Sequence, residues 1–428
     1  MDNKVRAFCD FLDTSVSAYH ATANMKKILD AEGYSQLFEH EIWSLEKGGK
    51  YYLIRGGTTL IAFRVPTVEP TGYMMSACHT DRPTFKLKEN SELRGVYTRL
   101  ATEGYGGMII SSWMDRPLSI AGRVMVETKD GVEKRLINID QDLLMMPNVA
   151  IHMNRTVNDG YKWNMAVDTI PMLGGSDDAD KFWPLVEKTA GGTILGHDLY
   201  LYPRQKASVW GIDGEFISGP ALDDLACAWG TLQGFLNARE SGAVPVLCAF
   251  DDEEVGSNSP QGAASTILEF TLERICGALG LDIHIMLAQS FLVSADNAHG
   301  LHPNHPELAD KANAPVLGKG VVLKFNAAQR YTTDGVSASV FRLIASRVGV
   351  PLQTYTNRPD IRGGSTLGHI SLTHVSVPTA DIGLPQLAMH SCYETAAVAD
   401  LEHLERIMTE YFSTHLSVQR DGGAAVLA

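Results

Sequence analysis

Apolar residues follow two different spacings along the chain. Near the N-terminus they recur every three or four positions, as at Val5, Phe8 and Leu12, and this spacing predicts helices within residues 5–34. From Tyr51 onward the apolar runs are short and are separated by glycine and proline, which is typical of strands. The first part of the chain therefore predicts helices followed by the strands of a sheet.

The middle of the chain differs in character from its two ends. Residues 88–208 contain strand-like runs with glycine turns and few helical windows, among them SIAGRVMVE and GGTILGHDLYLY. From Gly211 onward, helical and strand-like segments alternate, which predicts βα units and a mostly parallel sheet flanked by helices. We therefore expect an α/β domain made of residues 1–87 and 209–428, interrupted by a β-rich domain at 88–208. The inserted domain is too long for a loop, and we expect another copy of the chain to cover its strand edges.

The charge balance limits the kinds of partner. Among 428 residues, 36 are lysine or arginine and 50 are aspartate or glutamate, so the formal net charge is −14. A nucleic-acid or anionic-membrane partner needs a basic surface, so neither is expected. The sequence has no long uncharged apolar run, no recognisable secretion signal and no CxxC pair among its six cysteines. We therefore expect a cytoplasmic protein without a membrane partner.

Sequence signatures of several large enzyme classes are absent. The chain contains no GxGxxG, no GxxxxGK[ST], no GxSxG and no HExxH. These absences argue against dinucleotide binding, a phosphate-binding P-loop, a serine hydrolase elbow and a helix-borne zinc site.

Histidine and acidic residues instead stand next to several strand-like runs or at the start of a helix. In open parallel sheets, ligands bind outside the carboxyl ends of the strands, so such residues can meet in space although they are far apart in sequence. In chain order they are His79, Asp81, Asp223, Glu253, Glu254, Asp296 and His390.

These residue types suit a pair of zinc ions. Zinc accepts histidine nitrogen and carboxylate oxygen, and two ions about 3.5–4 Å apart need one carboxylate that touches both. They also need a free carboxylate to accept a proton from water. The Glu253–Glu254 pair fits this need, because neighbouring residues of an extended strand point in opposite directions. Asp81, two residues after His79, could orient that imidazole through a hydrogen bond.

Each of these residues has an ordinary structural interpretation when it is taken alone. A run of acids such as DDEE is usually a solvated turn, and Asp223 with Asp224 before a helix can simply cap that helix. A single histidine is more often a polar residue than a metal ligand. Only the ordered set favours a metal centre.

The set and its surrounding motifs resemble the aspartyl aminopeptidase family of dinuclear zinc aminopeptidases. The resemblance covers nearly the whole chain, and its most specific segments are HTDRP, GPALDDL, DDEEVGS, SADNAHG and QLAMHS. By this resemblance the α/β domain is a zinc aminopeptidase domain, and Asp223 bridges two zinc ions in each subunit. The remaining ligands would be His79 and Asp296 for one ion, and Glu254 and His390 for the other.

The resemblance also implies roles beyond the metal ligands. Glu253 would be the general base, and Asp81 would orient His79. The inserted domain would form a dimer, in which His152 of the segment NVAIHMNR reaches the neighbouring subunit's active site. Dimers would assemble into a tetrahedral dodecamer.

This sequence departs from the family at Arg82, Ala221 and Asp224, where Ser, Arg and Asn are common, and at a further position that bears on substrate preference. Some members have a lysine, linked to an acidic substrate side chain, where this chain has Ala328. Lys324 and Arg330 are the nearest cations, and in a strand both would share the face of Ala328. Arg330 is the better candidate for binding a carboxylate, because its planar guanidinium can donate two parallel hydrogen bonds.

The sequence thus predicts a metalloaminopeptidase that removes the N-terminal residue of short peptides, with a preference for Asp or Glu. Manganese or cobalt could replace zinc. A neutral or broad preference is the first alternative. The others are an N-deacylase or carboxypeptidase with the same two-metal scaffold, and a self-assembling shell protein without activity. A glycosidase that uses Glu253 and Glu254 is disfavoured, because its two carboxyls should lie about 5–9.5 Å apart across a sugar.

Overall fold

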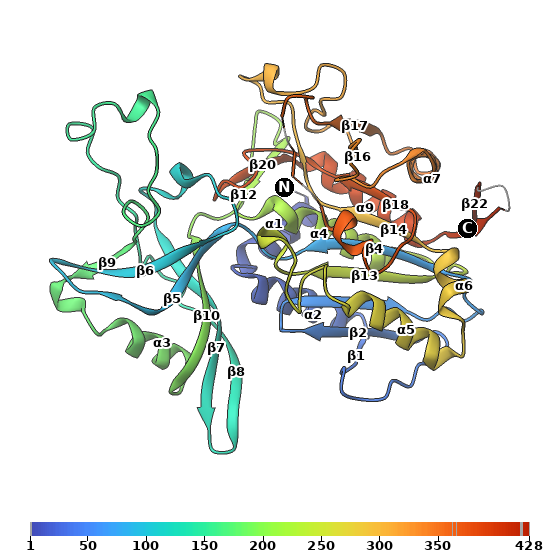
Figure 1. Ribbon diagram of the computed structural model, residues 1–428, viewed down its shortest axis with the longest axis horizontal. Helices are drawn as coiled ribbons and strands as arrows, with labels where there is room; N and C mark the ends of the chain where they lie inside the picture. Colours follow the sequence, from blue (N-terminus) through green and yellow to red (C-terminus); the bar gives the residue numbers. More distant parts are fainter. Residues whose placement is uncertain (1, 362, 365, 420–422, 428) are drawn as a thin grey trace.

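The computed structural model describes residues 2–361, 363–364, 366–419 and 423–427. Its largest sheet has nine strands and mostly parallel neighbours (Figure 1). In spatial order they are β1 (Ser35–Gln36), β2 (Lys50–Arg55), β3 (Thr59–Arg64), β13 (Val244–Phe250), β4 (Tyr73–His79), β14 (Phe291–Ala295), β18 (Thr379–Gly383), β16 (Val321–Phe325) and β17 (Leu352–Thr356).

The centre of this sheet is buried on both faces. Every residue of β4, β13 and β14 is buried, in keeping with near-continuous apolar sequences such as VPVLCAF. β13, β4, β14 and β18 are successive parallel neighbours. Their carboxyl ends therefore lie along one edge of the sheet.

Helices cover both faces of the nine-stranded sheet. Alternate residues of a strand point to opposite faces, and Met74 and Met75 of β4 accordingly belong to two separate cores. One face packs against α1 (Asn3–Thr14), α2 (Ala18–Ala31), α4 (Leu222–Asn237), α7 (Gly335–Arg347) and α9 (Val398–Phe412). The other packs against α5 (Ile267–Leu279), α6 (Ile283–Ala288) and α8 (Leu367–Ser371). The expected α/β fold with a mostly parallel sheet is confirmed.

One segment with a strand-like pattern is instead partly helical. DIHIMLAQSFLVSAD forms the short helix α6 before β14 begins. The Asp282 side chain accepts hydrogen bonds from the backbone N–H groups of His284 and Ile285, which satisfies donors that a helix start leaves free.

A separate antiparallel sheet of six strands projects to one side (Figure 1, left). It has its own core, in which Phe85 and Trp113 pack edge to face, and α3 (Phe182–Ala190) lies against it. We call it the inserted sheet. Its strands are β8 (Gly131–Asn138), β7 (Leu118–Thr128), β10 (Ile194–Pro203), β5 (Thr84–Leu93), β6 (Tyr97–Tyr105) and β9 (Met172–Gly175).

Two smaller sheets complete the described structure. A two-stranded sheet pairs β21 (His415–Val418) with β22 (Ala424–Leu427). A five-stranded sheet brings segments from both halves of the sequence next to the start of α4. Its strands are β11 (Ser208–Trp210), β12 (Phe216–Gly219), β20 (Glu394–Ala397), β19 (Pro385–Leu387) and β15 (Ala298–His299).

Candidate metal centre

Histidine and carboxylate side chains meet at the carboxyl edge of the nine-stranded sheet. His79 ends β4, Asp296 follows β14 directly, and the 3-10 turn η4 (Glu253–Val255) follows β13. The start of α4 supplies Asp223, and the loop after β19 supplies His390. The structure thus brings together the residues that the sequence predicts as metal ligands and base.

Asp223 lies between the two histidines. Its Oδ1 is 3.5 Å from His79 Nε2, and its Oδ2 is 3.5 Å from His390 Nε2. One oxygen of this carboxylate thus faces each imidazole, so the side chain could contact a cation on either side.

The donor atoms form overlapping groups. Within each group, one ligand atom per residue lies within 4.8 Å of the others. His390 Nε2 is also 3.4 Å from Glu254 Oε2. The three groups are His79–Asp223–Asp296, Asp223–Glu254–His390 and His79–Glu253–Glu254.

Two buried oxygens of this cluster have no hydrogen-bond partner among the described residues. They are Asp223 Oδ1 and Glu254 Oε1, on side chains that are only 4% and 3% exposed. An unpaired buried carboxylate is costly, and a cation removes that cost. The donor set of imidazole nitrogens and carboxylate oxygens fits zinc.

The concentration of acidic groups changes their protonation. Burial, together with the neighbouring Asp296 and Asp81, raises the pKa of the Glu253 carboxyl to about 8. Burial and the nearby Asp223 hold the pKa of Glu254 well above its usual range. Burial alone would lower the pKa of His79, but its contacts with Asp223 and Asp81 outweigh this and raise it. The cluster therefore favours positive charge at its centre.

Asp81 holds the ring of His79. The Nδ1 atom of His79 lies 3.2 Å from the carbonyl oxygen of Asp81 and 3.3 Å from its carboxylate. This contact leaves Nε2 to face Asp223. It is the contact that the sequence predicts for Asp81.

The expectation that Glu253 and Glu254 alternate along an extended strand is wrong. β13 ends at Phe250, and Asp252 has a left-handed φ of 59°, which starts the turn η4. The two carboxylates are brought to His79 by this turn. Their backbone N–H groups donate to the Asp81 carboxylate, at 3.2 Å for Glu253 and 3.1 Å for Glu254.

The expectation that Lys324 and Arg330 share one strand face is also wrong. β16 ends at Phe325, and a turn follows in which Gln329 has a φ of 56°. Lys324 is buried and lies 3.6 Å from Asp296 Oδ2. Arg330 is partly buried, and its side chain has no hydrogen bond or ion pair within the described part of the chain.

His152 is exposed in a turn within the region of the inserted sheet. It does not belong to any of the three donor groups found among the described residues. Within one subunit, then, His152 is not part of the cluster.

Two supporting residues escaped the sequence analysis. Glu394 of β20 is buried and accepts hydrogen bonds from the backbone N–H groups of His390 at 2.7 Å and Asp223 at 3.0 Å. Tyr105 of β6 donates its phenolic proton toward Asp81 and Asp252. No spacing rule signals either residue, because each contact depends on how separate sheets pack together.

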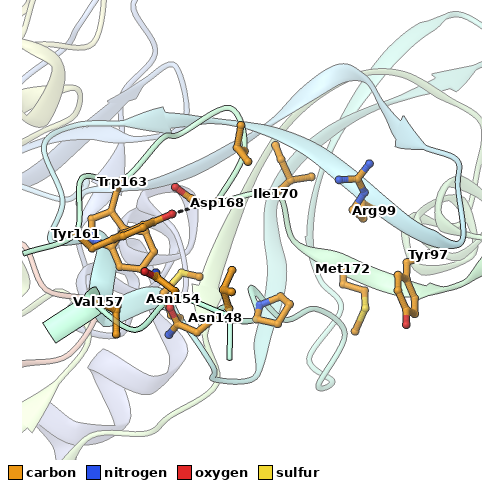
Figure 2. Close-up of a pocket in the computed structure, with 14 residues that line it drawn as sticks. Tyr97, Arg99, Asn148, Asn154, Val157, Tyr161, Trp163, Asp168, Ile170 and Met172 are labelled. Carbon is orange, nitrogen blue, oxygen red and sulfur yellow. Dashed lines mark hydrogen bonds between the residues drawn. The ribbon is translucent and has the colours of Figure 1, made fainter. Parts of the chain in front are cut away.

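A cavity of about 500 Å³ lies in the inserted region, and none of its lining residues belongs to the cluster (Figure 2). Tyr161 and Trp163 line one end, and Tyr97 and Met172 line the other. Its one carboxylate, Asp168, is already engaged, because Tyr161 donates to it at 3.0 Å. The rest of the lining is mostly apolar, with Arg99, Asn148 and Asn154 as further polar residues.

Imidazoles and carboxylates gather at the carboxyl edge of the parallel strands of an α/β sheet, with His79 buried and His390 partly exposed, and this arrangement fits a metal-dependent hydrolase. Comparison with known proteins shows to which family of metal-dependent hydrolases the chain belongs. The family described as Aminopeptidase I zinc metalloprotease (M18) matches residues 11–412. The chain belongs to this M18 family of zinc aminopeptidases, which confirms the family resemblance and identifies it as an aminopeptidase.

Relatives resemble the chain over almost its full length. A probable M18 family aminopeptidase 2 of Clostridium novyi (strain NT) is 41% identical, with 96% of this chain and 100% of the relative covered. A probable M18 family aminopeptidase 2 of Clostridium acetobutylicum is also 41% identical, with 94% of this chain and 97% of the relative covered.

No helix among the described residues is both long and apolar enough to cross a membrane.

Solved structures share the fold. A chain of the Ape4 and Nbr1 complex, solved by cryo-EM, is 35% identical with a TM-score of 0.91, and 95% of this chain and 85% of that chain are covered. The mApe1 dodecamer of S. cerevesiae is 26% identical with a TM-score of 0.85, and 96% of each chain is covered.

Proposed function

We propose that this aminopeptidase uses two zinc ions per subunit, bridged by Asp223, to remove the N-terminal residue of short peptides. The observation that carries the proposal is the position of Asp223, with one carboxylate oxygen 3.5 Å from each of His79 and His390. His79 and Asp296 would hold one ion, and Glu254 and His390 the other. When bound, the ions would polarise the scissile carbonyl and lower the pKa of water.

Glu253 is the proposed proton carrier. It lies in a donor group with His79 and Glu254, where its carboxylate would accept a proton from water activated by the ions. Its protonated carboxyl would then deliver the proton to the departing amine. Asp81 would keep His79 in place through its contacts with Nδ1.

A preference for N-terminal Asp or Glu is the proposed specificity. Such a substrate needs a cation, since an unpaired buried carboxylate costs several kcal/mol. Arg330 has no ion-pair partner among the described residues, which leaves its guanidinium available. Lys324 already pairs with Asp296. It would therefore affect substrate binding mainly through its positive charge, and not through a direct contact.

Residues 88–208 are the proposed oligomerisation domain. Several apolar side chains near His152 face outward, among them Met153, which is 82% exposed, and Ile151, which is 47% exposed. A second copy of the chain would cover them and would receive His152 in its own active site. By analogy with the solved mApe1 dodecamer, the dimers would assemble into a tetrahedral dodecamer.

We place the enzyme in the cytoplasm. All six cysteines are described, and they are free and buried. Unpaired, scattered thiols fit a reducing compartment.

A substrate panel tests the proposed function. Metal-free enzyme would be reconstituted with zinc, manganese or cobalt and given amino-acid anilides with either a free or an acylated amino group. We expect cleavage only of the free-amino substrates, with the highest rate at two ions per subunit. Cleavage of the acylated substrates, or full activity at one ion, would contradict the proposal.

A further inference from the structure

The end of β6 reaches from the inserted sheet to the candidate metal centre. Residues 105–107, which we call the β6 tip, lie next to Asp81, Glu254 and His390. Tyr105 contacts Asp81, Gly106 approaches Glu254, and the carbonyl oxygen of Gly107 lies 2.5 Å from His390 Nδ1.

Tyr105 makes the most directed of these contacts. Its hydroxyl lies 2.8 Å from Asp81 Oδ2 and 2.8 Å from Asp252 Oδ1, and its single proton can serve either oxygen. The ring is fixed by an edge-to-face contact with Tyr200 of β10, at 5.5 Å between ring centres. Burial and the nearby Asp81 raise the pKa of the phenol, so Tyr105 remains a donor.

Asp81 links Tyr105 to several residues of the candidate metal centre. Its carboxylate faces His79 Nδ1 and accepts the backbone N–H groups of Glu253 and Glu254. With a side chain that is 3% exposed, it has little freedom to find other donors. A change in its orientation would therefore reach residues on both β4 and η4.

The position of Gly106 shows how closely the β6 tip approaches. Its φ is +74°, and a Cβ atom there would lie 3.1 Å from Glu254 Cβ and 3.3 Å from the Glu254 carbonyl oxygen. A larger residue would be strained in conformation and crowded against the cluster.

We propose that Tyr105 is a positioning residue, which acts through Asp81 to hold His79 and the Glu253–Glu254 turn in the geometry that binds metal and performs hydrolysis. The inserted sheet is thus part of the active-site framework of its own subunit. This inference rests on the proposed function, in which His79 and Glu254 hold metal.

The test compares Tyr105→Phe with Tyr200→Phe. The two phenols are in ring contact, but the Tyr200 hydroxyl has no hydrogen bond within the described structure, so Tyr200→Phe is the matched control. Loss of the direct partner of a metal ligand, as Asp81 is to His79, typically costs about 10–100-fold in metal affinity or activity, and Tyr105 acts on that partner. For Tyr105→Phe we expect kcat to fall about tenfold or more with KM within about twofold, and zinc release to a chelator to be about tenfold faster. Tyr200→Phe should match wild type in both measurements.

A second pair of variants separates positioning from simple packing. In an Asp81→Ala background, adding Tyr105→Phe should cause no further increase in the rate of zinc release, because the residue through which it acts is gone. Equal effects in both backgrounds, or a Tyr105→Phe enzyme identical to Tyr200→Phe, would overturn the proposal. Zinc release is measured without substrate, so an error in the proposed proton transfer by Glu253 leaves this test readable.

Discussion

Lys324 is a buried counter-ion of Asp296. Its ammonium group donates to the Asp296 carbonyl oxygen at 2.7 Å and lies 3.6 Å from the Asp296 carboxylate. Burial alone would lower the pKa of Lys324, but Asp296 outweighs this and holds it above its usual range. A lysine that sequence spacing suggests as a substrate contact is therefore bonded to a candidate metal ligand.

Replacing Lys324 should destabilise the metal-free protein. Lys324→Met leaves the Asp296 carboxylate buried without its cation, and breaking a buried pair in this way costs about 3–5 kcal/mol. Chemical unfolding of the zinc-free protein measures the loss, and Lys319→Met, at an exposed lysine on the preceding loop, is the control. Unchanged stability with an altered ratio of Asp to Leu cleavage would instead support a direct substrate contact.

Removing the Glu253 carboxylate should separate metal binding from turnover. Glu253→Gln keeps the shape of the side chain but cannot accept a proton, so we expect both ions to remain and the rate to fall about 10²–10⁴-fold. Metal content by mass spectrometry is measured beside kcat. A variant that loses metal, or that stays near wild-type activity, would show that Glu253 has another role.

The two sides of the cluster should respond differently to substitution. Asp223→Ala should lose both ions, whereas His390→Ala should mainly lose one, because Asp223 places one carboxylate oxygen 3.5 Å from each histidine. Titration of the metal-free variants with zinc gives the number of sites. Equal losses would argue against Asp223 as a bridge.

Arg330→Leu tests the proposed preference for acidic residues. If Arg330 binds the substrate carboxylate, kcat/KM for Asp and Glu anilides should fall, while values for Leu and Ala anilides change little. A wild-type preference for Leu of more than about tenfold, which corresponds to about 1.4 kcal/mol, would exclude the acidic assignment. A wild-type preference for Asp that survives the substitution would place the specificity residue elsewhere.

Co-expression can show whether His152 acts across a subunit interface. His152→Ala and Glu253→Gln are each expected to be nearly inactive alone. In mixed oligomers, a subunit with an intact Glu253 can receive His152 from its neighbour, so activity should partly return.

Deletion of residues 87–208 should abolish both oligomer and activity, as measured by light scattering and anilide cleavage. An active monomer, or no recovery in the mixture, would contradict the proposed assembly.

The convergence of the cluster could be predicted because it follows from one property of the sheet. His79, Glu253 and Asp296 each come soon after a continuous apolar run, and parallel strands end at the same edge. Predicting that these three residues meet therefore required only the strand pattern, and no knowledge of side-chain contacts. Asp223 and His390, which come from a helix start and a loop, belong to the same ordered set, and the family resemblance added only the division of the ligands between two ions.

Other features depend on local backbone conformation or on contacts between separate sheets. The left-handed residues Asp252 and Gln329 redirect the chain after β13 and β16, and neither is a glycine that would signal such a turn. Tyr105 and Glu394 support the cluster from two other sheets, and hydrophobic spacing carries no information about how those sheets dock.

The residues of the candidate metal centre lie far apart in the sequence, so they are synthesised at different times. His79 is made early, whereas His390 and the Glu394 carboxylate that binds its backbone come late in the chain. Until residue 394 has been synthesised and β20 has paired with β12, Asp223 lacks one of its two histidine neighbours. A nascent chain therefore carries an incomplete centre until this late segment has been made and has folded onto β12.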